Sequence, residues 1–143
     1  MRGKLRALAV CAAVIVGFTV MANEKPSPEY QTAMKNLGTA NGALRGNITA
    51  KDYPAIEANA ATFKASFTVA EAFWTGKKAD DAIALAKTGL KGAADLEAAA
   101  KAKNDAGIDA ARGTIGATCR GCHMVHRDEL PDKTYEINVE GKK

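Results

Sequence analysis

Apolar residues recur at helical spacing in four consecutive segments of the chain. Each segment is separated from the next by a short link that contains glycine, lysine or asparagine. A period of three to four residues places the apolar side chains on one face of a helix, which is typical of helices that pack together. We therefore predict four helices, with approximate ranges 27–46, 52–74, 80–103 and 104–130.

The four apolar stripes differ in regularity. The second is the most regular, whereas the first is interrupted by Asn41 and the third is diluted by Gly89 and Gly92. The expected inward positions are Tyr30, Met34, Leu37, Leu44 and Ile48, then Ile56, Ala60, Phe63, Phe67, Ala70 and Trp74, then Ile83, Ala86, Leu90, Ala93 or Ala94, Glu97 and Ala100, and finally Ile108, Ala111, Ile115, Cys119, Cys122 and His126.

Four helices joined by short links indicate an all-α fold, an antiparallel up-down-up-down four-helix bundle. At 143 residues the chain has room for one ordinary domain, because two well-buried cores need a longer chain. We place this domain at residues 23–130. The tail, residues 131–143, alternates Tyr135, Ile137 and Val139 as a short extended segment would.

The N-terminus has the composition of a secretory signal peptide. Three basic residues precede an apolar run that ends at Val20, and Ala22 suits a cleavage site. The run is shorter than the roughly 20 residues that span a bilayer. We therefore expect residues 1–22 to be removed on export to the periplasm, which leaves no stable membrane anchor.

Charge gives no indication of a nucleic-acid partner. The chain has 20 Lys and Arg residues against 16 Asp and Glu residues. Three of the cations and none of the anions lie in residues 1–22, which leaves 17 cations against 16 anions after cleavage. Because charges of both signs are also interspersed, we expect no nucleic-acid binding.

The strongest chemical signal is the segment Cys119-Arg120-Gly121-Cys122-His123. Cys-x-x-Cys-His is the attachment signature of c-type haem. Two cysteines three residues apart project from nearly one face of a helical turn, so both sulfurs can form thioethers with one porphyrin. We predict one covalently attached haem c on Cys119 and Cys122, with His123 as the proximal iron ligand.

Other uses of the two cysteines stay open at this point. A structural zinc site needs four ligands around the metal, whereas Cys11 belongs to the predicted signal and His126 lies on the same helix as His123. A thioredoxin-like pair lies where a strand meets a helix, but this motif follows a long helical stripe. A disulfide would leave a haem-free interaction module. We expect His126 to be a polar flank rather than a second axial ligand, because it shares a helix with His123.

The pattern CxxCHxxxR from Cys119 to Arg127, late in a signal-bearing four-helix chain of this length, resembles the class II c-type cytochromes. These are cytochrome c prime and its low-spin relatives. The resemblance covers about residues 27 to 130. It implies a four-helix bundle that holds a single haem.

The chain departs from this family at one position in the first helix. Members often carry an arginine there, near the haem propionates, where this chain has Tyr30 and Gln31. Lys35, Arg45 or Arg127 could take its place as the contact to a propionate.

Two non-enzymatic functions follow from the resemblance. The first is a periplasmic electron carrier with a low-spin haem that exchanges electrons with redox partner proteins. The second is a gas-binding protein with a pentacoordinate haem, as in cytochrome c prime, that takes nitric oxide or carbon monoxide. The resemblance also favours a homodimer through the first two helices.

Met34 distinguishes the two functions. Of four methionines, two lie in the predicted signal and Met124 is adjacent to His123. In an alignment with the family's first helix, Met34 falls where low-spin members carry methionine. We therefore predict Met34 as the distal iron ligand, and the electron carrier as the function.

Overall fold

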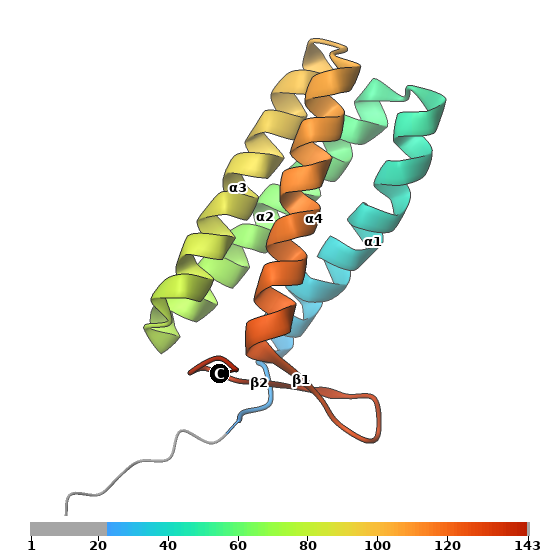
Figure 1. Cartoon of the computed structure of the whole chain (residues 1–143). Coiled ribbons are helices and arrows are strands. Elements are labelled where there is room, and N and C mark those ends of the chain that lie inside the picture. The colour runs from blue at the N-terminus through green and yellow to red at the C-terminus, as the bar shows by residue number, and fades with distance from the viewer. Residues whose placement is uncertain (1–22, 143) are drawn as a thin grey trace, which may run out of the picture.

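Four long helices make up most of the chain (Figure 1). The computed structural model describes residues 23–142, so the predicted signal peptide, residues 1–22, lies outside the described residues. The helices are α1 (Pro28–Ala50), α2 (Tyr53–Lys77), α3 (Asp80–Lys101) and α4 (Asp105–His126). The predicted all-α bundle of four packed helices is confirmed. Over residues 23–142, no helix combines the length and the apolarity that a membrane span requires.

Three of the helices begin after a residue whose side chain caps the first turn. Ser27 accepts a hydrogen bond from the backbone N–H of Tyr30, and Asp52 and Asn104 each accept one from the backbone N–H three residues further along. Each of these caps satisfies a donor that the first turn of a helix leaves free. The chain can therefore start a new helix after a link of only two or three residues.

The helices pack most closely with their neighbours in the chain. The close pairs are α1 with α2, α2 with α3, and α3 with α4, whereas the backbones of α1 and α4 make little close contact. At one end of the α1–α4 seam, Asp105 accepts hydrogen bonds from Lys51 Nζ at 2.8 Å and from the Tyr53 hydroxyl at 2.9 Å. Away from this end, the α1–α4 seam is the looser side of the bundle.

The core confirms the predicted stripe of α2 and corrects that of α3. All six predicted positions of α2 are buried. In α3, Leu96 is fully buried, whereas Ile83 and Leu90 are partly exposed. The cause is a close approach between two helices, because a Cβ on Gly89 would lie 2.5 Å from the ring of Phe67 on α2. The α3 helix thus turns Gly89 toward α2 and Gly92 toward Ile115 of α4, and the predicted stripe is rotated.

A short hairpin covers the end of the bundle where α4 finishes (Figure 1). Strand β1 (Arg127–Glu129) pairs antiparallel with β2 (Tyr135–Ile137). The extended segment in the tail was predicted, but the fourth helix was predicted to continue to Leu130 and instead ends at His126. The reason is that Arg127 takes an extended backbone conformation to pair with β2.

Two glycine substitutions should change the free energy of unfolding in opposite directions. Gly89→Ala would bring a Cβ to within 2.5 Å of the buried Phe67 ring, and we expect a loss of about 1–3 kcal/mol from overpacking. Gly42→Ala places its Cβ in open space on an exposed part of α1, so the better helix propensity of alanine should add up to about 1 kcal/mol. Urea unfolding followed by circular dichroism measures both, and unchanged stability of Gly89→Ala would contradict the close approach.

Candidate functional site

One turn of α4 faces a narrow cavity inside the bundle. Cys119, Cys122 and His123 line this cavity together with Met34 of α1. Its volume of about 30 Å³ admits a water-sized molecule but not a porphyrin. The other lining residues are mostly apolar and include Tyr30, Leu37, Phe67, Trp74, Leu85 and Thr118.

The two cysteines are partly buried and are not joined by a disulfide. Burial raises the pKa of Cys119. Burial also raises the pKa of Cys122 to about 11, with further contributions from Cys119 and Asp81. Both groups are therefore neutral thiols at pH 7. A catalytic redox cysteine needs the opposite shift, a lowered pKa that makes it a thiolate.

His123 is held as a neutral imidazole by its surroundings. Burial lowers the pKa of His123, and the positive charge of Arg127 lowers it further. Arg127 Nη1 lies 3.2 Å from His123 Nδ1, and because a guanidinium can only donate, Nδ1 is the acceptor and Nε2 carries the proton. The guanidinium also stacks on Tyr135 of the hairpin, 3.6 Å from the ring centroid. Metal coordination by histidine requires this neutral form.

Met34 is the half-buried methionine of the cavity wall. It lies on α1, and the three donors of α4 line the same space. Met124 is different, because its side chain is 66% exposed on the surface of α4. Of the methionines in residues 23–142, Met34 is therefore the one that lines the cavity together with His123, the predicted proximal ligand.

Tyr30 and Trp74 line the cavity without adding an unpaired polar group. Trp74 Nε1 donates a hydrogen bond to the Tyr30 hydroxyl at 3.2 Å, and the two rings meet edge to face. Burial, with a contribution from Cys122, raises the pKa of Tyr30 well above its usual range. Among the described residues, no buried side-chain nitrogen or oxygen lacks a partner. The wall is thus apolar toward anything that enters the cavity.

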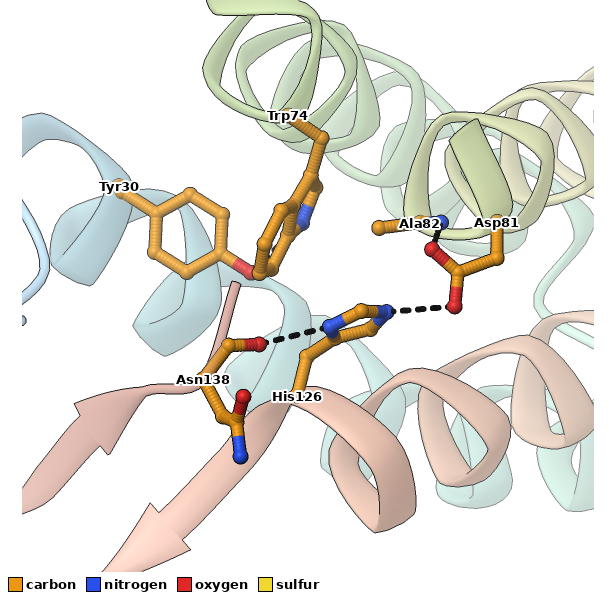
Figure 2. Close-up of polar contacts among 6 residues, drawn as sticks. All are labelled: Tyr30, Trp74, Asp81, Ala82, His126 and Asn138. Carbon is orange, nitrogen blue, oxygen red and sulfur yellow. Dashed lines mark hydrogen bonds and ion pairs between the residues drawn. The ribbon is translucent and has the colours of Figure 1, made fainter. Parts of the chain in front are cut away.

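His126 was predicted to lie on the inward stripe beside the site, and its burial confirms that position, outside the cavity lining. Its side chain is 1% exposed and packs on Trp74, with ring centroids 4.7 Å apart (Figure 2). Nδ1 lies 2.8 Å from the backbone oxygen of Asn138, and Nε2 lies 3.0 Å from Asp81 Oδ2. In the sequence, its burial was indicated by its position on the inward stripe, four residues after Cys122. Nothing in the sequence marked its two partners.

Comparisons with known proteins returned no match to a family model, to a curated protein or to a solved structure. Over residues 23–142, no three His, Cys, Asp or Glu side chains are grouped so that they could hold a metal ion. A closed structural zinc site would need four such ligands. The chemistry of the site therefore has to be inferred from the two thiols, the imidazole and the thioether around the cavity.

Removal of the Arg127 guanidinium should raise the pKa of His123 in protein without haem. In Arg127→Gln the cation no longer opposes protonation of the ring. Burial and Arg127 lower the pKa of His123 in the folded state, so the free energy of unfolding decreases as the pH falls. In Arg127→Gln this decrease should be smaller. An NMR titration of the imidazole measures the pKa. Arg120→Gln removes an exposed cation from the same helix and serves as the control, and an equal rise in both variants would contradict a specific contact.

Proposed function

We propose that the protein is a single-haem c-type cytochrome that carries electrons. The observation that carries this proposal is that Cys119, Cys122, His123 and Met34 line one apolar cavity. Two thiols, an imidazole and a thioether are the donors needed for a covalently attached haem with histidine and methionine as axial ligands. The helices that supply them are joined by short links, which supports an up-down-up-down order.

The surroundings suit a porphyrin in chemical character, but the cavity must widen to hold one. Its volume is about 30 Å³, so α1 and α4 have to move apart. This is the helix pair with little backbone contact. Gly116 precedes Cys119 by about one turn, and nothing lies within 4 Å of the position that a Cβ on it would take. The surface of α4 at Gly116 is therefore not covered by a closely packed side chain.

Each residue has a distinct part in binding. Cys119 and Cys122 provide the thiols that add across the two vinyl groups of the porphyrin. His123 offers Nε2, and for this its proton must move from Nε2 to Nδ1. A protonated Nδ1 no longer accepts from Arg127, so the guanidinium becomes free to pair with an anion such as a haem propionate. The bound haem would supply reversible one-electron transfer between ferrous and ferric iron.

Met34 supports an electron carrier over a gas-binding protein. It is already part of the cavity wall before any ligand enters. A thioether opposite histidine raises the reduction potential and fills the position that nitric oxide or carbon monoxide would take. We propose that the carrier is non-enzymatic, works in the periplasm with redox partner proteins, and forms a homodimer through α1 and α2.

Covalent haem can be tested by the mass of the exported protein. We expect residues 23–143 plus one haem, retained in acid-acetone because thioethers do not dissociate. Cys119→Ser and Cys122→Ser should each keep one attachment, and the double variant should lose its haem on extraction. An unmodified mass with a Cys119–Cys122 disulfide would refute the proposal.

The role of Met34 can be tested by the optical spectrum. Met34→Ala should convert a low-spin haem to a high-spin haem that binds carbon monoxide readily, because the sixth position becomes open. Met124→Ala is the matched control, since this methionine is 66% exposed, and its spectrum should not change. A high-spin ferric spectrum in the unsubstituted protein, with immediate uptake of carbon monoxide after reduction, would favour the gas-binding alternative.

A further inference from the structure

Among residues 23–142, two large hydrophobic side chains are exposed, and both lie next to His123 or its partner Arg127. Met124 follows His123 in α4 and is 66% exposed, and Tyr135 of β2 is 37% exposed. The Tyr135 ring stacks on the Arg127 guanidinium, whose Nη1 lies 3.2 Å from His123 Nδ1. Single exposed apolar residues are ordinary, whereas neighbouring ones indicate contact with another molecule. Such a contact would lie beside the candidate site.

The outer surface of α4 near these side chains is cationic. Residues 110–127 include three arginines and no aspartate or glutamate. Arg112 and Arg120 are exposed, and neither forms an ion pair with a carboxylate of residues 23–142. Arg120 precedes His123 by three residues and Met124 by four, so the three side chains are neighbours on the helix. A partner that meets Met124 therefore also meets a positive charge.

The hairpin adds no net negative charge on the face that carries Tyr135. Side chains alternate between the two faces of a strand, so Arg127 and Glu129 of β1 share this face with Tyr135. Glu129 forms an ion pair with Lys133 at 2.8 Å, which offsets its charge. The other face of the hairpin carries two carboxylates, Asp128 and Glu136.

The composition of this surface is typical of a contact with another protein. Methionine, tyrosine and arginine are enriched at protein interfaces, whereas lysine, aspartate and glutamate are depleted. Tyrosine and arginine are also frequent among the residues that contribute most of the binding energy. A polybasic segment that binds a membrane has roughly four to eight cations, whereas residues 110–127 have three. The surface therefore fits a protein better than a lipid headgroup layer.

We propose that this surface is a docking face for an acidic redox partner protein. The docking face consists of four exposed residues, Arg112, Arg120, Met124 and Tyr135. The inference rests on the proposed function, because it assigns the place at which the partner exchanges an electron with the haem. Carboxylates on the partner complement the arginines, which raises the rate of encounter and orients the complex. Met124 then brings the partner beside His123, the predicted iron ligand.

Docking can be measured on the exported protein with an acidic peptide. Hexaglutamate is the probe, and carbon-13 in the methionine methyl groups is the NMR reporter. Residues 23–143 contain two methionines, Met124 in the docking face and Met34 in the cavity wall. We expect the peptide to shift the Met124 signal and to leave the Met34 signal in place. Binding should weaken about tenfold between about 0.01 M and 0.15 M salt, because the Debye length shortens from about 30 Å to 8 Å.

Two variants with the same change in charge locate the binding site. Arg120→Glu should weaken peptide binding about tenfold, because it places a carboxylate opposite carboxylates. Lys64→Glu makes the same change at an exposed lysine of α2 that forms no ion pair within residues 23–142, and it should bind as the unsubstituted protein does. An unshifted Met124 signal, an equal loss in both variants, or binding to phosphatidylglycerol vesicles without binding to the peptide would refute the docking face.

Electron exchange then tests whether the docking face serves the haem. One electron passes from ferrous iron to hexacyanoferrate(III), which becomes hexacyanoferrate(II). This oxidation should slow about threefold as the salt concentration rises from about 0.01 M to 0.15 M, whereas oxidation by the cation tris(phenanthroline)cobalt(III) should become faster. Arg120→Glu should remove the first dependence, and Lys64→Glu should keep it.

The two readouts separate the docking face from the proposed function. A protein that lacks haem but shows the Met124 shift with hexaglutamate would refute the electron carrier and support a docking face for an acidic protein. A haem protein with no Met124 shift, and with oxidation rates that do not depend on salt, would refute the docking face and leave the electron carrier in place.

Discussion

The burial of one turn of α4 against an apolar wall determines the chemistry of the candidate site. Desolvation favours the neutral form of every ionisable group, so it raises the pKa of both thiols and lowers that of His123. The same three groups in water would include a weakly acidic thiol and a partly protonated imidazole. In the bundle they are neutral donors.

The packing of the helices determines where such a ligand can enter. The close approach of Gly89 to Phe67 draws α3 onto α2, and Gly92 allows a similar approach to Ile115 of α4. These contacts leave α1 and α4 as the pair with little backbone contact. The donors lie on α4 and Met34 on α1, so the predicted axial groups lie on two helices whose backbones make little close contact.

Much of the fold could be predicted because its signals are local. The spacing of the α2 stripe and the capping oxygens of Ser27, Asp52 and Asn104 depend on residues within one or two turns. The grouping of Cys119, Cys122 and His123 on one face is equally local, since it follows from helical geometry alone. The stripe of α3 could not be predicted in the same way. Its orientation depends on a contact between Gly89 and Phe67, which only the tertiary packing brings together.

The two histidines show where prediction from sequence stops. His123 and His126 are three residues apart, yet His123 meets a donor, Arg127, and His126 meets two acceptors. A ring that accepts at Nδ1 is neutral. Asp81 lies 45 positions away from His126 in the sequence and Asn138 lies 12, so the partners of His126 are set by the docking of α3 and the tail. One helix thus presents a neutral imidazole to the cavity and a second imidazole to the structure that closes the end of the bundle. It can do both because successive side chains of a helix point in different directions and meet different neighbours.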